Sequence, residues 1–334
     1  MIHLRLPIAE PQRLPFYLAM EEWAARTLPP AEYFFAWRVR PTVICGRNQE
    51  MDKEVDMDYC RKAGINVVRR RSGGGCVYAD MDNFMFSYIS PGDEITSTFA
   101  HYTTMIADVL CSLGLKASAT GRNDILVDGK KVSGNAFYHL PGRCIAHGTM
   151  LYDFNPEAMR RAITPSRAKL ESKSVKSVES RVTSLIASGL TITHEQFEKY
   201  MVDALCDDTI ELSDADIADI RLIEQSYYDP SFLYRKGEIP AETADDHIHR
   251  HAHVPGVGEM NFTIATDEHS NISRIEISGD FFLTGDPAVI LGKLQGVPLT
   301  RSDIGNALAG TDPGLAIAGL DRSTLIRILA NEQQ

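Results

Sequence analysis

The sequence lacks the features that mark several other classes of protein. Its six cysteines are scattered over 334 residues without paired short spacings, so we expect neither a disulfide framework nor a zinc site built from cysteines. No apolar run approaches the ~18 residues that a membrane helix requires, and Pro7 interrupts the opening segment too early for a signal peptide. We therefore expect a cytoplasmic protein that has no membrane partner.

Basic residues are also outnumbered, with 34 Lys and Arg against 45 Asp and Glu. The net charge is −11, whereas a nucleic-acid-binding domain normally carries a basic patch or stripe. We therefore expect no nucleic-acid partner. The hydrophobic share of 44% and the length of the chain suit one large domain and a small one better than a single core.

Three arginines and three glycines, in contrast, stand together in one unusual run, RRRSGGGCVY over residues 69–78. Residues without a Cβ let backbone N–H groups approach a ligand closely, and the arginines place fixed positive charge beside them. The run indicates an anion site, although a flexible hairpin turn with solvated arginines fits the same residues.

A second segment predicts a hairpin that carries a lysine. Residues 125–127 have the composition of a short strand, Asp128-Gly129 is a two-residue turn signal, and residues 131–137 fit the returning strand. Small residues follow Lys131 and leave room on its flank for a ligand. A lysine on an exposed strand is otherwise an edge charge that blocks sheet pairing.

These segments, with His147-Gly148-Thr149 before an apolar strand, resemble the lipoate-protein ligase family. In that family an R-R-x-S-G-G-G-x-V loop, a K-V-S-G-x-A strand and an H-G-T strand surround an acyl-adenylate. The resemblance covers most of residues 10–240. Two departures are visible: Ala79 stands where members often carry His, and Asp82 stands where Gly commonly precedes the Asn.

The resemblance implies an ATP-dependent ligase that converts lipoate to lipoyl-AMP and passes the lipoyl group to a lysine of a carrier. Lys131 is the expected catalytic residue, because a cation at the junction of acyl group and phosphate can neutralise developing charge. Asp124 is also expected to meet Mg²⁺. The residues expected to bind lipoyl-AMP or ATP are Arg70, Ser72, Gly73, Gly74, Gly75, Val77, Tyr78, Asn83, Asn123, Asp124, Ser133, Gly134, Ala136, His147, Gly148, Thr149 and Met150.

The same resemblance implies the partners and the organisation of the chain. The expected carriers are lipoyl domains of 2-oxoacid dehydrogenase complexes or the glycine cleavage H protein, and the ligase is expected to act as a monomer. The implied fold is α/β (α+β), with a mixed-sheet catalytic domain like those of biotin and lipoate ligases. A small α+β C-terminal accessory domain is expected after it, as in the longer members.

Periodicity in the sequence supports this organisation. Residues 236–246 contain Gly237 and Pro240 among polar residues without a helix or strand pattern. We therefore expect a catalytic lipoate/ATP-binding domain over residues 1–245 and the accessory domain over residues 246–334. Helices are expected over residues 15–27, 99–113, 194–206, 213–227, 287–295, 301–309 and 321–330, and strands over 33–37, 42–45, 67–70, 83–89, 260–265 and 272–277.

Three other functions fit part of the pattern. An ATP-independent octanoyl or lipoyl transferase would need a cysteine nucleophile just before the lysine strand, and residues 120–124 contain none; Cys76 and Cys144 lie elsewhere. A non-catalytic binding protein has no need of Lys131 together with the whole glycine run. A biotin ligase is disfavoured because its basic glycine loop has a different order of Gly and Arg.

Four histidines alternate along residues 247–253. On an extended strand they would share one face, and imidazole is the commonest transition-metal ligand. Structural zinc usually draws its ligands from separate elements, and no cysteine lies nearby. We therefore favour a solvated strand in the linker between the domains.

Overall fold

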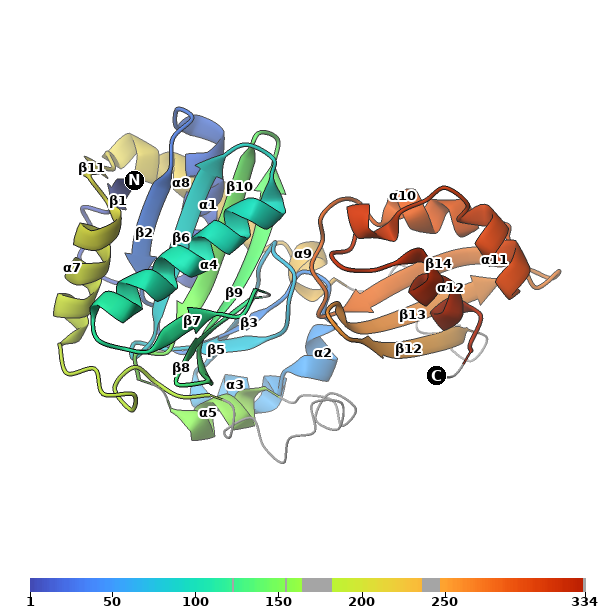
Figure 1. Ribbon diagram of the computed structural model, residues 1–334, viewed down its shortest axis with the longest axis horizontal. Coiled ribbons are helices and arrows are strands. Elements are labelled where there is room, and N and C mark those ends of the chain that lie inside the picture. Colours follow the sequence, from blue (N-terminus) through green and yellow to red (C-terminus); the bar gives the residue numbers. More distant parts are fainter. Residues whose placement is uncertain (122, 154, 164–181, 236–246, 333–334) are drawn as a thin grey trace. The chain divides into compact units, whose positions relative to one another are not determined.

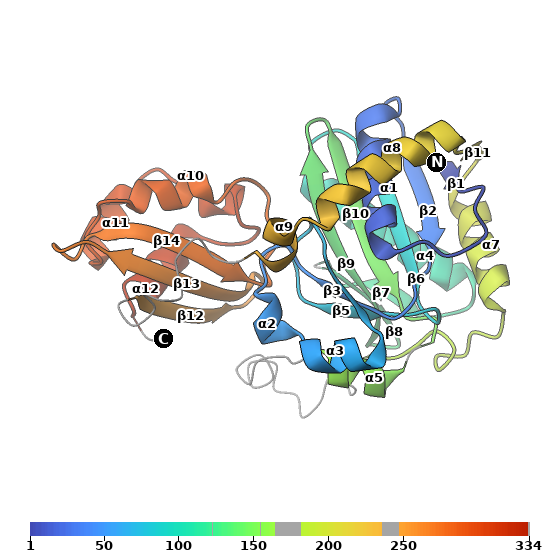
Figure 2. The ribbon, with the colours of Figure 1, turned by 180° about the vertical axis from the view of Figure 1, so that it is seen from behind.

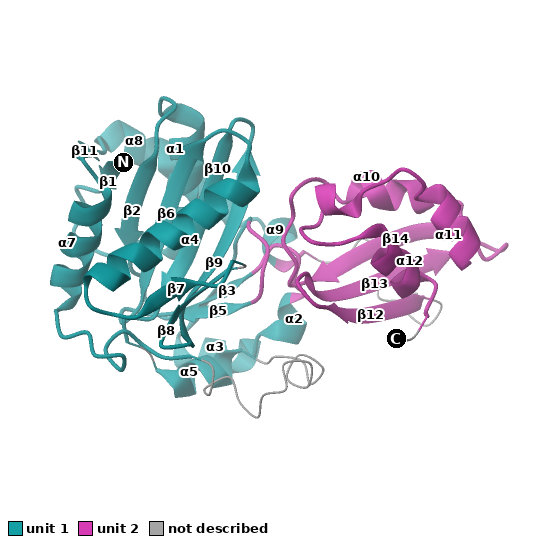
Figure 3. Cartoon of the chain, in the orientation of Figure 1, with its two compact units in different colours: residues 1–45, 51–71, 76–233 teal, residues 46–50, 72–75, 234–334 magenta. Residues whose placement is uncertain are grey.

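The computed structural model describes residues 1–121, 123–153, 155–163, 182–235 and 247–332. They form two compact units (Figure 3). Unit 1 comprises residues 1–45, 51–71 and 76–233, and unit 2 comprises residues 46–50, 72–75 and 234–334. The expected domain boundary at 236–246 lies outside the described residues.

Unit 1 is built on an eight-stranded mixed sheet in the order β11-β1-β2-β6-β10-β9-β8-β7 (Figure 1). The strand β1 runs parallel to both of its neighbours, and the other pairs are antiparallel. The strands are β1 (Ile2–Arg5), β2 (Tyr33–Trp37), β6 (Phe84–Pro91), β7 (Ala117–Ala119), β8 (Asp124–Val127), β9 (Lys130–Leu140), β10 (Arg143–Met150) and β11 (Asp208–Glu211).

Helices cover both faces of this sheet, as Figures 1 and 2 show from opposite sides. Side chains of α1 and α8 contribute to one hydrophobic core, and those of α4 and α7 contribute to a second. The strand β2 separates the two cores, because Phe35 packs in the first and Phe34 in the second, as the two-residue period of a strand requires. These helices are α1 (Leu14–Thr27), α4 (Ile95–Ser112), α7 (His194–Leu205) and α8 (Asp214–Glu224).

A small sheet in the order β4-β3-β5 completes unit 1. Its strand β4 ends at Arg69, the first arginine of the basic run, and its strand β5 follows the glycines. Its elements and the remaining helices of the unit are β3 (Thr42–Cys45), β4 (Asn66–Arg69), β5 (Val77–Ala79), α2 (Met51–Glu54), α3 (Met57–Ala63), α5 (Pro156–Ala162), η2 (Gln225–Tyr227) and α9 (Pro230–Tyr234).

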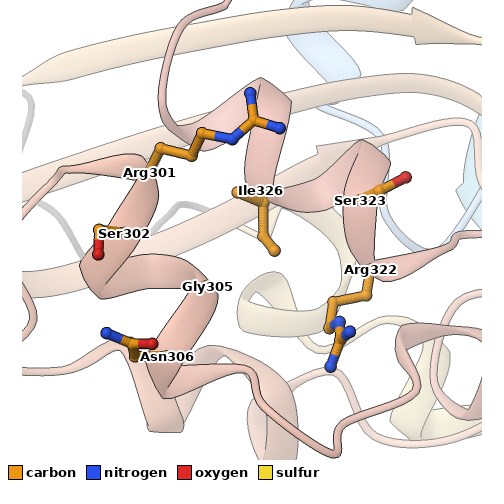
Figure 4. A pocket seen from close by; sticks show the side chains of 7 residues that line it. All are labelled: Arg301, Ser302, Gly305, Asn306, Arg322, Ser323 and Ile326. Atoms are coloured by element: carbon orange, nitrogen blue, oxygen red, sulfur yellow. The ribbon is translucent and has the colours of Figure 1, made fainter.

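Unit 2 pairs a three-stranded antiparallel sheet with short helices around one apolar core. Arg301, Asn306 and Arg322 are among the residues that line a pocket of about 500 Å³ between two of these helices (Figure 4). No residue expected to bind substrate lines this pocket. The elements are β12 (Ile248–Val254), β13 (Gly258–Thr266), β14 (Ile272–Gly279), α10 (Ala288–Leu291), η4 (Gly292–Leu294), α11 (Arg301–Ala307), η5 (Pro313–Leu315) and α12 (Arg322–Leu329).

The expected fold is confirmed: a mixed α/β sheet domain is joined to a small sheet domain. The strands at 33–37 and 42–45 have the expected bounds, and each expected helix is present with shifted ends. The parallel strands β1 and β11 were not expected. Among the described residues, no helix has the length and apolar character needed to cross a bilayer.

Candidate active site

The lysine strand begins with the expected two-residue turn. Asp128 and Gly129 both have positive φ, 48° and 76°, as a type I′ hairpin turn requires. This turn joins β8 to β9 and fixes their register. The expected hairpin is therefore confirmed.

A β-bulge then redirects Lys131. Ile125 pairs with Ser133 while Leu126 pairs with Lys131, so Val132 is an extra residue on the longer strand. In a regular strand, residues 131 and 134 would point to opposite faces. The bulge places the Lys131 ammonium over Gly134 instead, and bulges of this kind are common beside active sites.

The ammonium of Lys131 forms an ion pair with Asp124. The distance between Lys131 Nζ and Asp124 Oδ1 is 2.6 Å, and the two side chains are 33% and 31% exposed. Solvent therefore reaches both side chains, while the Asp124 Oδ1 atom itself is buried beneath the lysine. Exposed ion pairs are weak, typically worth about 0–1 kcal/mol, so an anionic substrate can compete for this cation.

Gly134 provides the space that the lysine occupies. A Cβ at this position would lie 2.8 Å from Lys131 Nζ and 3.0 Å from its Cε. The small residue that the sequence analysis interpreted as room for a ligand is thus room for the lysine itself. On the neighbouring strand, the Thr149 hydroxyl donates to the Gly134 carbonyl at 3.4 Å.

A buried amide cluster fixes the strands around the lysine. Asn135, which is buried, donates through Nδ2 to the carbonyl of Asn123 at 3.1 Å. The hydroxyl of Ser133 donates to Asn135 Oδ1 at 3.2 Å. A Cβ on Gly148 would lie 1.8 Å from that same oxygen, so only glycine fits there. The expected residues Asn123, Ser133 and Gly148 are therefore brought together by Asn135, which the sequence analysis did not select.

His147 belongs to a second buried network. Its Nδ1 lies 2.9 Å from Oε2 of Glu21 on α1, and the side chains are 5% and 0% exposed. The hydroxyl of Ser87 also donates to Glu21, and Trp37 Nε1 donates to that hydroxyl at 2.9 Å. Glu21 therefore fixes the imidazole from the face of the sheet that α1 covers.

Sequence reasoning missed Glu21, although a signal was present. Glu21 and Glu22 are adjacent acidic residues inside an otherwise largely apolar helix, and both are buried. Buried carboxylates require partners. The partner, however, lies 126 residues away on β10, and no local pattern identifies it.

The three arginines of the basic run are built into unit 1. Arg69 Nε donates to the Leu233 carbonyl at 2.8 Å, and Arg70 Nη1 donates to the Ile44 carbonyl at 3.0 Å. Burial lowers the pKa of both guanidinium groups. Arg71 forms an ion pair with Glu22 at 3.0 Å. Their charge is therefore fixed in position by protein contacts.

Tyr78 and Asn83 meet at a carboxylate that was not expected. Asn83 Nδ2 donates to Asp80 Oδ1 at 3.0 Å. Burial, the charge of Asp80 and a hydrogen bond to it raise the pKa of Tyr78, and burial raises the pKa of Asp80. These three side chains form a buried polar cluster next to the strand that follows the glycine run.

The glycine run itself belongs to unit 2 and contacts other residues of that unit. The N–H of Gly74 donates to the Phe281 carbonyl at 3.3 Å. A Cβ on Gly73 would lie 2.4 Å from the same carbonyl oxygen. Gly73 therefore permits a close approach of backbone to backbone, whereas the sequence analysis attributed the glycines to a ligand.

The apolar site candidates differ in their surroundings. Met150 is fully buried in the core beneath α4 and α7. Ala136 is buried and pairs with His147 across the β9–β10 ladder. Val77 is half-buried and packs against the core around α1.

The described residues contain no group of three His, Cys, Asp or Glu side chains arranged to hold a metal. The histidines of residues 247–253 are accounted for in part. His251 Nε2 and His253 Nδ1 each lie 2.8 Å from a carboxylate oxygen of Glu259. Their strand, β12, pairs with β13 throughout, so it is an edge strand of unit 2. The expected strand with solvent-exposed histidines is therefore confirmed, but it belongs to the sheet of unit 2 and not to a linker.

Two family models match this chain. The lipoyl protein ligase A/B catalytic domain matches residues 14–206, and the bacterial lipoate protein ligase C-terminus matches residues 245–329. Together they span most of the sequence.

Curated proteins similar to this chain carry a consistent description. Lipoate-protein ligase LplJ of Bacillus subtilis is 32% identical over 306 residues, which are 88% of this chain and 90% of that protein. Lipoate–protein ligase 1 of Staphylococcus aureus is 32% identical over 322 residues, which are 94% and 95% of the two chains.

Solved structures share the fold at lower identity. LipL1 of Plasmodium falciparum, in complex with lipoate, has a TM-score of 0.75 at 17% identity and covers 99% of this chain and 98% of that one. A lipoate-protein ligase A bound with ATP has a TM-score of 0.59 at 22% identity, with coverage of 69% and 98%. A bipartite lipoate protein ligase of Thermoplasma acidophilum, described with its E2 lipoyl domain, has a TM-score of 0.62 at 23% identity, with coverage of 72% and 99%.

Proposed function

Because the chain belongs to the lipoate-protein ligase family, we propose that it activates lipoate with ATP and transfers the lipoyl group to a lysine of a carrier protein. The observation that carries the site assignment is the Lys131–Asp124 pair. Solvent reaches the side chain of the Lys131 cation, and a β-bulge in its strand sets the direction of that side chain.

A carboxylate is a poor acyl donor until one of its oxygens becomes a leaving group. Attack of the lipoate carboxylate on the α-phosphate of ATP supplies this and releases pyrophosphate. Lys131 would exchange Asp124 for the reacting oxygens and neutralise their charge. The same ammonium would stabilise the oxyanion that forms when a carrier lysine attacks the mixed anhydride. One such electrostatic group is typically worth about 10²–10³ in rate.

We assign supporting roles to the neighbouring residues. Asn135, which is hydrogen-bonded to Asn123 and Ser133, would hold β8 and β9 in place. The nucleotide would bind next to Lys131 on these strands. Arg70, Val77 and Tyr78 flank the glycine run in sequence, and Ser72 to Gly75 remain the expected anion-binding loop, although the N–H of Gly74 is already bonded to the Phe281 carbonyl. The pair of Glu21 and His147 would keep the H-G-T strand in place.

Asp124 suits Mg²⁺, since this ion usually takes one or two carboxylates plus substrate phosphates. When bound, the ion would neutralise phosphate charge. The chain's own contribution is to hold the carboxylate next to Lys131 on adjacent strands.

We further propose residues 1–245 as the lipoate/ATP-binding domain and residues 246–334 as the accessory domain. The expected carriers are lipoyl domains of 2-oxoacid dehydrogenase complexes or the glycine cleavage H protein. A monomeric state and a cytoplasmic location remain predictions.

The thiols bear on the alternative transferase. Residues 120–124 hold no cysteine, and Cys144 is buried with its thiol directed to the Gly92 carbonyl at 3.4 Å. Cys144→Ser should therefore leave ATP-dependent ligation within about tenfold, which is ~1.4 kcal/mol of transition-state stabilisation. Trapping an acyl thioester on a cysteine of the protein would favour the transferase.

The function is tested by pyrophosphate release from purified protein with ATP and lipoate, with and without a lipoyl carrier domain. Release that requires lipoate, followed by a mass increase of the carrier by one lipoyl group, is expected. Carrier modification by an acylated donor protein without ATP would contradict the proposal.

A further inference from the structure

Two cysteine thiols face each other at the end of the small sheet. The Sγ atoms of Cys45 and Cys76 are 3.0 Å apart. Cys45 ends β3, and Cys76 directly precedes β5, which pairs with β3 in antiparallel register at Ile44 and Val77. The next residues of this ladder are the two cysteines. A disulfide has an S–S distance of about 2.05 Å, so bond formation requires an approach of about 1 Å between cross-strand neighbours.

The two thiols differ in access to solvent. Cys45 is fully buried, while Cys76 is half-buried. A reagent from solvent can therefore attack through Cys76, and Cys45 is positioned to react with the product. This division matches the requirement of a redox pair for one accessible thiol and one resolving thiol beside it.

The charge around Cys45 favours a thiolate. The pairing of β3 with β4 places Arg69 opposite Cys45, and the N–H of Arg70 donates to the Cys45 carbonyl at 3.0 Å. The hydrogen bond from Cys76 and the two arginines lower the pKa of the Cys45 thiol, whereas burial opposes them. The same hydrogen bond and burial raise the pKa of Cys76. The hydrogen bond lets a proton pass between the two sulfurs, and thiolates rather than thiols attack disulfides.

Oxidation of the pair would affect the glycine run because of where the two cysteines lie in the chain. Cys45 directly precedes residues 46–50, and Cys76 directly follows the glycine run at residues 72–75. These two segments are joined by a hydrogen bond from the N–H of Arg47 to the Ser72 carbonyl, 2.9 Å long. A bond between the cysteines would therefore join the bases of two adjacent loops, one of which is the proposed anion-binding loop.

We propose that Cys45 and Cys76 form a reversible redox site, oxidised by low-molecular-weight disulfides, whose disulfide form displaces the base of the glycine run and slows adenylation. The effect on adenylation rests on the proposed function, whereas formation of the bond does not. Misplacement of a binding group by about 1 Å can cost about 10²-fold in rate. We therefore expect at least a tenfold loss.

The oxidation balances in two exchanges. In the form of the pair that carries one proton, Cys76 passes this proton to Cys45 and attacks a disulfide RSSR, which forms a Cys76–SR bond and releases RS⁻. That thiolate takes the proton from Cys45, whose sulfur then attacks Cys76 Sγ and expels the second RS⁻. The two protein sulfurs lose two electrons, RSSR gains two, and the products are RSH and RS⁻.

The test equilibrates the full-length protein in mixtures of reduced and oxidised glutathione and then maps its peptides by mass. A peptide pair linked through Cys45 and Cys76 is expected, together with a fall of at least tenfold in pyrophosphate release that dithiothreitol reverses. The thiol buffers are removed before the assay and lipoate is added last, because lipoate carries its own disulfide.

Matched variants identify the responsible thiols. Cys76→Ser should resist inactivation by oxidised glutathione, and Cys144→Ser, which alters a buried thiol outside the pair, should be inactivated like the parent. Cys76→Ala tests the same point if the serine perturbs folding. Absence of the linked peptide pair, glutathione retained on Cys76 alone, or full activity of the linked protein would each overturn the proposal. A reduced protein that releases no pyrophosphate would instead contradict the proposed function and leave the mapped bond standing.

Discussion

Two of the pairs in unit 1 in which a side-chain nitrogen faces a carboxylate differ in their access to water. Lys131 and Asp124 are each about one-third exposed, whereas His147 and Glu21 are almost completely buried. Water screens and competes for the first pair, so it contributes little to stability. The second pair belongs to a buried hydrogen-bond network, where water cannot take the place of a lost partner. Loss of one member therefore leaves buried polar atoms without partners.

The comparison assigns different tasks to the two pairs. An exposed cation can exchange its carboxylate for a substrate oxygen, which a catalytic group must do. A buried pair cannot exchange partners without a large cost, and it therefore fixes the strand that borders the site. A change in the exposed pair should therefore lower activity more than stability, and a change in the buried pair should lower stability.

The largest expected effect is on overall ligation by Lys131→Ala. We expect a loss of about 10²–10³ in rate with an unfolding free energy within about 1 kcal/mol of the parent, because the pair is partly exposed. Lys130→Ala is the matched control, since Lys130 is exposed on the same strand, and it should change the rate by no more than a few-fold. Equal small losses in both variants would refute the assignment of Lys131.

Glu21→Gln should show the opposite pattern. Replacing the carboxylate disturbs hydrogen bonds from Ser87 and His147, and unsatisfied buried groups cost about 1–3 kcal/mol. Urea unfolding measures this loss. Glu211→Gln is the control, because Glu211 pairs with Arg5 where both side chains are more than half exposed, and it should change stability by less than about 1 kcal/mol. Similar stabilities for the two variants would remove the contrast between buried and exposed pairs.

Two glycines on neighbouring strands provide a further test of the contrast between the buried and the partly exposed parts of the site. Gly148→Ala would place a Cβ 1.8 Å from Asn135 Oδ1 inside the buried cluster, and we expect a stability loss of about 1–3 kcal/mol from overpacking. Gly134→Ala would instead meet the flexible end of Lys131. It should shift the ammonium and lower the rate of ligation while stability changes less. If Gly134→Ala is the more destabilising of the two, the space over Gly134 has a structural rather than a catalytic role.

Sequence predicted the local parts of this site better than its long-range parts. The dipeptide Asp128-Gly129 is typical of a two-residue hairpin turn, so the hairpin and the lysine strand were predictable from sequence. The bulge at Val132 was not, because an extra residue in a strand leaves no mark on composition. The family and fold predicted from the motifs are confirmed. The assignment of individual site residues remains a prediction.

Long-range contacts account for what the sequence analysis missed. Glu21 finds His147 on a strand 126 residues later, and the backbone of Phe281 approaches Gly73. Glycine patterns reveal that a close approach occurs and do not reveal what approaches. The three arginines had the same ambiguity, since a buried guanidinium and a ligand-facing one look alike in sequence.

The role of Lys131 is tested most directly by a single-turnover measurement on Lys131→Ala that separates the two chemical steps. Formation of lipoyl-AMP from lipoate and ATP is followed first, and then transfer from preformed lipoyl-AMP to a carrier domain. If Lys131 neutralises charge in both steps, both should slow, adenylate formation by about 10²–10³, while Lys130→Ala stays near the parent rate. Formation of lipoyl-AMP at the parent rate by Lys131→Ala would contradict this role.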